Sequence, residues 1–207
     1  MCDKFILNYI QSEKASDILR GFSLLQKSGE ISDLSPNDAV TIFSLLIPML
    51  VHNHEKVRKT AFYLFYNILN NFSDYLENAN DAIPNCLSSM LNKDKYISNM
   101  GEQSIEILFD LYDPNVWWPS VEKILFHSKC PPYRVKIMSI IYNHCDEVPI
   151  QALLQLLDDP VLAIQKMAYE MLQLNDQNLV FEDLAECRNY LKIQTNPYEL
   201  KMTDHQK

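Results

Sequence analysis

The chain has 207 residues, of which 47% are hydrophobic and 22% charged, and its formal net charge is -9. The proportions are those of an ordinary folded protein, whereas the negative charge argues against a nucleic-acid-binding protein, which needs a surplus of Lys and Arg. Three glycines are too few for the turns of a multi-stranded sheet or for a phosphate-binding loop, so they favour helices.

Membrane insertion and export are also not expected. The longest strongly apolar run, residues 42–51, is far shorter than the ~20 residues that span a bilayer. The first ten residues have no basic leader and no cleavage site. Five scattered cysteines in such a chain are expected to be reduced thiols, so we expect a cytoplasmic protein.

Taken in chain order, the first segments with a helical pattern are residues 5–10 and 14–27, which form a degenerate helix pair. After them, an apolar residue followed by proline and an apolar stretch recurs four times, and the prolines are 36, 35 and 30 residues apart: Pro48, Pro84, Pro119 and Pro149. This spacing is typical of stacked helix pairs. We expect the last three prolines in the first turn of a helix, and a kink at Pro48.

Each of these first helices is followed by a short polar break and a second helix. The second helices are expected at residues 55–69, 95–111, 133–143 and 161–174. In each, a small residue follows an apolar one by four positions, and the small residues are Ala61, Gly101, Ser139 and Ala168. Because a small residue on a buried face lets a neighbouring helix approach closely, Gly101 is expected at a tight helix contact.

This pattern resembles the HEAT repeat, whose units contain an apolar-Pro helix, an Asp-Pro turn and a Val-Arg-x-x-Ala second helix. The residues that carry the resemblance are D158-DPVLAIQKMAYEML and V57-RKTA. The turn Asp is Asp159, with His52, Asn92 and Cys130 at the matching positions elsewhere. The Arg is Arg58, with Ser98, Lys136 and Gln165 at the matching positions.

The fold class expected is therefore all-α, an α-solenoid of about five to six HEAT-like antiparallel helix pairs. We expect one domain over residues 1–194, in which residues 180–193 form a further amphipathic helix. Residues 195–207 are polar and aperiodic, which predicts a disordered tail.

Catalytic and metal-binding motifs are scarce. No HExxH, CxxC or GxSxG motif occurs. The one constellation with zinc ligand types is His127, Cys130, His144 and Cys145. Against it, adjacent residues on a helix point about 100° apart, and Pro131 and Pro132 interrupt the chain. We expect no catalytic residue, cofactor or metal, while a metal-dependent enzyme stays the least favoured alternative.

Basic residues cluster at the expected turns inside the helix pairs. In a stack of such pairs equivalent turns lie along one edge, so these side chains are expected to form a basic ridge: Lys56, Lys93, Lys95, Lys129 and Arg134. An acidic protein partner is one interpretation, and ordinary solvated turns are the other. Trp117 and Trp118 are adjacent, so one indole is a candidate exposed anchor, although burial of both between repeats is the alternative.

Residues 14–145 resemble a TOG domain of the CLASP-type microtubule-associated proteins. The resemblance is carried by K56-VRKTAFYLFYNILNNFSDYL and by the block from Ala79 to Leu108. It implies that the turns face tubulin, an acidic protein, through the basic ridge. TOG domains that bind free tubulin well have a Trp in the first turn, where this chain has Asp17. We thus expect a non-catalytic protein-binding module, cytoplasmic or cytoskeletal, with a general HEAT-repeat adaptor as the alternative.

Overall fold

The computed structural model describes residues 4–29, 31–145 and 148–175. All regular structure in these ranges is helical. The described residues up to Val121 form one compact unit, and those from Glu122 onward form a second. The boundary falls within a helix, α7 (Pro114–His127). One domain over residues 1–194 stays a prediction, as do the helix at 180–193 and the disordered tail, which lie outside the described residues.

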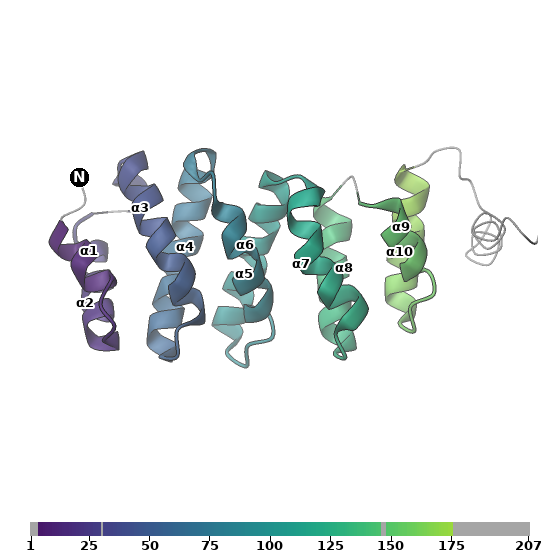
Figure 1. Cartoon of the computed structure of the whole chain (residues 1–207), viewed down its shortest axis with the longest axis horizontal. Helices are drawn as coiled ribbons and strands as arrows, with labels where there is room; N and C mark the ends of the chain where they lie inside the picture. Colours follow the sequence, from purple (N-terminus) through teal and green to yellow (C-terminus); the bar gives the residue numbers. More distant parts are fainter. Residues whose placement is uncertain (1–3, 30, 146–147, 176–207) are drawn as a thin grey trace, which may run out of the picture. The chain divides into compact units, whose positions relative to one another are not determined.

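The first unit consists of consecutive helix pairs (Figure 1). Its α-helices before α7 are α1 (Lys4–Ile10), α2 (Ala15–Lys27), α3 (Pro36–Leu46), α4 (Glu55–Phe72), α5 (Ile83–Ser89) and α6 (Lys95–Leu111). Its 3-10 helices are η1 (Ile31–Asp33), η2 (Ile47–Val51), η3 (Ser73–Tyr75) and η4 (Ala79–Ala82). The second helices α4 and α6 pack against each other, behind α3 and α5 in the view of Figure 1. The predicted bounds of α6 are confirmed, and α4 runs three residues further than expected.

The second unit holds the end of α7 and three further helices, α8 (Pro131–His144), α9 (Ile150–Leu156) and α10 (Leu162–Asn175). Helix α10 packs against both α8 and α9. Across the described residues the helices thus form five consecutive pairs, the last being α9 with α10. This confirms the expected all-α class of stacked helix pairs, and the described residues hold five of the expected five to six pairs.

The core of the first unit is built around α4, which is packed against α2, α3 and α6. Val57, Ala61 and Ile68 on this helix have no exposed surface. Phe65 stacks on Phe43 of α3, with 4.6 Å between the ring centroids. Burial of large apolar side chains on several faces of one helix explains why its sequence is almost entirely apolar after the first turn.

Gly101 lies at the tight contact predicted for it. A Cβ atom at this position would stand 1.8 Å from Ser89 Oγ and 3.0 Å from the carbonyl oxygen of Cys86, both on α5. The α5 backbone therefore approaches α6 as closely as it does only because position 101 has no side chain.

The four prolines take four different places. Pro84 is in the first turn of α5, as predicted. At Pro48 the α-helix α3 has given way to η2, which fits the expected kink. Pro119, however, lies inside α7 rather than at its start, so that prediction was wrong. The helix begins earlier because Asp113 Oδ1 accepts from the Asn115 N–H at 2.8 Å and Pro114 supplies the first-turn proline. Pro149 is the residue just before α9.

Helix α8 begins two residues earlier than expected, at Pro131. Because of this earlier start, the residues of α8 that match those of the other second helices lie two positions earlier than predicted. From α4 onward the third residue of each second helix is buried, namely Val57, Ile97, Tyr133 and Ile164. Val135 and Ser139, which we matched to Val57 and Ala61, are only half-buried. The residue of α8 that matches Ala61 is therefore Ile137, which is not small. The prediction of a small residue at this position, Ser139, was wrong.

Candidate functional site

The turns inside the helix pairs share one local geometry. In each, a side chain accepts a hydrogen bond from the backbone N–H two residues later, and the second helix begins one residue after that N–H. The acceptors and their distances are Ser12 (3.1 Å), His52 (3.0 Å), Asn92 (2.9 Å), Ser128 (3.3 Å) and Asp159 (2.8 Å). Such turns satisfy backbone donors that would otherwise lack partners at a helix start.

The fourth residue of each second helix from α4 onward reaches back to a backbone carbonyl before it. Arg58 Nη1 donates to the carbonyls of His52 (2.7 Å) and Asn53 (2.9 Å). Ser98 Oγ donates to that of Met90 (2.9 Å) and Arg134 Nε to that of Leu125 (2.5 Å). Gln165 donates to Asp159. The residues matching Arg58 and Asp159 in the α7–α8 pair are therefore Arg134 and Ser128, not Lys136 and Cys130.

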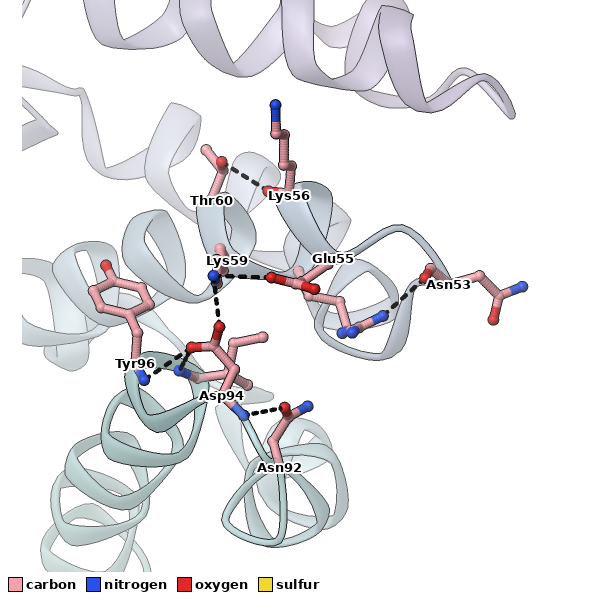
Figure 2. A network of polar contacts seen from close by, with 10 residues as sticks. Asn53, Glu55, Lys56, Lys59, Thr60, Asn92, Asp94 and Tyr96 are labelled. Atoms are coloured by element: carbon pink, nitrogen blue, oxygen red, sulfur yellow. Dashed lines mark hydrogen bonds and ion pairs between the residues drawn. The ribbon is translucent and has the colours of Figure 1, made fainter.

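One polar network joins two successive turns of the first unit (Figure 2). Lys59 Nζ lies 2.9 Å from Glu55 Oε1 and 2.5 Å from Asp94 Oδ2. Asp94 also caps α6, because its Oδ1 accepts from the N–H of Tyr96 at 2.9 Å. The Lys59 ammonium lowers the pKa of the Asp94 carboxyl, and Asp94 followed by Glu55 raises the pKa of Lys59.

We name the surface formed by these two turns and the first turns of α4 and α6 the turn edge. It carries three lysines of the predicted ridge: Lys56, Lys93 and Lys95. All three are exposed, and none makes an ion pair with a described residue. In Figure 2 the ammonium of Lys56 points away from the network around Lys59. The network holds one ammonium and two carboxylates, so the positive charge on the turn edge comes from the three exposed lysines and not from Lys59.

Two tyrosines beside the turn edge, Tyr63 and Tyr96, are not among the partner-binding residues predicted from the sequence. Tyr63 and Tyr96 are each 42% exposed. Together with Gln26, Lys59 and Thr60 they line a shallow hollow of about 360 Å³. The sequence around Tyr63 carries no signal of its exposure, because its neighbours along the chain, Phe62 and Leu64, are both fully buried.

The two tryptophans are buried, which was the alternative to their role as exposed anchors. Trp117 has no exposed surface and Trp118 is 8% exposed. The Trp117 indole stacks on Phe109, with centroids 4.2 Å apart, and its Nε1 donates to the Tyr112 carbonyl at 3.1 Å. Neither indole is presented to a partner, because α7 already begins at Pro114 and turns both toward the interior.

The remaining ridge residues, Lys129 and Arg134, lie in the second unit. Lys129 is exposed on the turn before α8. Arg134 is buried and pairs with the buried carboxylate of Asp159, and burial lowers the pKa of its guanidinium. The prediction that Arg134 lies on a basic surface was wrong. Arg134 is the fourth residue of α8, and its side chain turns back to the Leu125 carbonyl.

The cysteine and histidine residues weighed as zinc ligands do not form a cluster. In the part of the chain that the structure describes, no three His, Cys, Asp or Glu side chains are arranged to hold a metal ion. Cys130 is exposed, while Cys86 is buried, which raises the pKa of its thiol.

Within the ranges that the structure describes, no helix is both long and apolar enough to cross a membrane.

Comparison with known proteins supports the fold. No protein-family model and no curated protein matches the sequence. A chain from the structural study of microtubule plus end tracking by XMAP215, CLIP-170 and EB1 is 14% identical, with a TM-score of 0.60 over 94% of this chain and 90% of that one. An engineered protein is 13% identical, with a TM-score of 0.46 over 82% of this chain and 77% of its own. The first likeness shows that the chain has an α-solenoid fold of stacked helix pairs.

Proposed function

We propose that this chain is a non-catalytic, TOG-like protein-binding module that engages an acidic protein, tubulin being the favoured partner, through the turn edge. The observation that carries the proposal is that Lys56, Lys93 and Lys95 are exposed on neighbouring turns of a protein whose net charge is -9. A local basic surface on an acidic protein attracts an acidic partner in one orientation and repels it in others.

The tyrosines give the turn edge a source of affinity as well as of orientation. Tyr96 follows Lys95 directly, and Tyr63 lines the same hollow. Exposed aromatic side chains supply much of the binding energy at protein interfaces, while charges at the rim mostly set the rate of encounter. These two tyrosines thus take the role of exposed aromatic anchor that was expected of Trp117 or Trp118. The setting of the interaction is cytoplasmic or cytoskeletal.

Co-sedimentation of the full chain with tubulin and with microtubules tests the proposal. We expect Lys93→Glu/Lys95→Glu to weaken binding about tenfold or more at low salt, because two attractive pairs become repulsive. Raising the salt should weaken binding by wild type and narrow the difference between the two proteins.

Lys27→Glu/Lys123→Glu is the matched control, since both lysines are exposed and neither lies on the turn edge. It changes the net charge equally and should bind as wild type does. Absence of binding at low salt, or equal losses in the two double variants, would contradict the proposal.

A second candidate is a general helical-repeat adaptor for another protein. It is favoured by Asp17, which stands where tubulin-binding TOG domains have a Trp and which accepts a hydrogen bond from Ser12 Oγ at 3.1 Å within its own turn. This candidate predicts that Tyr96→Ala abolishes capture of a partner other than tubulin, identified by mass spectrometry, while tubulin does not bind even at low salt.

A further inference from the structure

A larger hollow lies between α3 with η2 and the loop that joins α4 to α5. Its volume is about 520 Å³, within the range of ligand-binding sites. About half of its wall is apolar, and the residues that form this part are Val40, Phe43, Ile47, Pro48, Tyr75, Leu76 and Ala79. All of them belong to the first unit.

Hydrogen bonds hold both sides of the hollow. The Tyr112 hydroxyl donates to the Leu76 carbonyl at 2.8 Å and accepts from the Ala79 N–H at 3.0 Å, which fixes the loop. On the other side, Asn85 Nδ2 donates to the Ile47 carbonyl at 3.2 Å. The hollow is therefore formed before any partner arrives, so that little ordering free energy is lost on binding.

The charge around this hollow is negative, in contrast to the turn edge. Glu77 and Asp81 line it, exposed Asp74 precedes it, and no Lys or Arg is among its lining residues. Neither Glu77 nor Asp81 makes an ion pair with a described residue. The mouth also exposes apolar surface, since Tyr75 is 54% and Val40 36% exposed.

We propose that this hollow docks a basic peptide segment of a partner protein, with one large apolar side chain inside and flanking Lys or Arg side chains against Glu77 and Asp81. The apolar wall selects the anchor and the two carboxylates select its neighbours. An acidic or uncharged segment would leave both carboxylates without counter-charges. The module would thus hold partner surfaces of opposite charge at two separate sites.

Fluorescence anisotropy of a short dye-labelled peptide tests this inference on the full chain. The probe has a central Leu with a pair of Lys on each side and Ser-Gly ends. Its two matched peptides carry Ser for the Leu, or Glu for the Lys. We expect the first peptide to bind at least tenfold more tightly than either of the others.

Variants then locate the binding. Glu77→Lys/Asp81→Lys and, separately, Tyr75→Ser should each weaken binding of the Lys-Leu peptide by about tenfold. Glu13→Lys/Asp33→Lys is the matched control, because it makes the same change in net charge at exposed positions outside the hollow. Circular dichroism of each variant, unchanged from wild type, shows that the fold is kept.

Three results would overturn the inference. Equal losses in the two charge-reversal variants would mean attraction to net charge alone. Equal binding of the Leu and Ser peptides would mean that no side chain enters the hollow. Concentration-dependent self-association, seen by analytical ultracentrifugation and lost in Tyr75→Ser, would assign the hollow to a second copy of the chain.

Discussion

At the scale of single residues, Gly101 decides how closely α5 and α6 pack. A glycine in the middle of a helix costs up to about 1 kcal/mol relative to alanine, so its presence needs a packing reason. That reason is the distance of 1.8 Å between a Cβ at this position and Ser89 Oγ, with the Cys86 carbonyl oxygen just beyond at 3.0 Å.

We therefore expect Gly101→Ala to lower the free energy of unfolding by about 1–2 kcal/mol, because overpacking outweighs the gain in helix propensity. Urea unfolding followed by tryptophan fluorescence measures the change. Ser89→Ala/Gly101→Ala should lose less than the two single losses added together, since it removes the nearest atom. A Gly101→Ala protein as stable as wild type would show that the contact is not tight.

At the scale of elements, the start of α6 is tied to the start of α4 by the Lys59–Asp94 pair. The lowered pKa of Asp94 means that its contribution to stability is present above the ordinary value of 3.8 and is lost as the pH falls through its folded value. The raised pKa of Lys59 places the loss of its contribution above 10.5, on the alkaline side. The pair is thus intact throughout the neutral range.

Asp94→Asn keeps a good N-cap residue but removes the charge. We expect a lower melting temperature than that of wild type at pH 7, and a difference that shrinks as the pH falls below 3.8. Thermal unfolding by circular dichroism at several pH values measures it. Glu55→Gln is the control with the smaller expected effect, because Glu55 ranks behind Asp94 in raising the pKa of Lys59. A pH-independent difference would contradict this account.

At the scale of the whole molecule, the described residues form two compact units rather than one evenly packed stack. Within the first unit α4 is the central element, since helices pack on it from several sides and most of its apolar residues are buried. The shorter first helices, such as α5 with seven residues, have fewer buried side chains.

Hydrogen exchange should therefore be slowest in the middle of α4, around Leu64 to Ile68, because exposing those amides requires the first unit to unfold. Exchange in α1 should be much faster, since this helix has seven residues and only Ile6 and Ile10 are buried. Mass spectrometry of exchanged peptides measures both. Equal protection of α1 and α4 would mean that the first unit opens only as a whole.

The amino-acid pattern by itself determined the helix pairs and much of the turn edge. Apolar spacing of three and four residues is a local property, so it located α4 and α6 and placed Lys56, Lys93 and Lys95 near the helix starts, where they are exposed. Gly101 could likewise be read as a close contact because a glycine inside a helix is costly without one.

Only the tertiary structure decided which side of each helix is covered, because that depends on neighbours distant in sequence. It buried Trp117 and Trp118 and exposed Tyr63 and Tyr96, although all four are aromatic. Arg134 is likewise buried, in contact with the Leu125 carbonyl and Asp159, because α8 begins two residues earlier than its apolar spacing indicated. The hollow beside Tyr75 arises where α3, η2 and the loop after α4 meet, which no single segment of the sequence encodes.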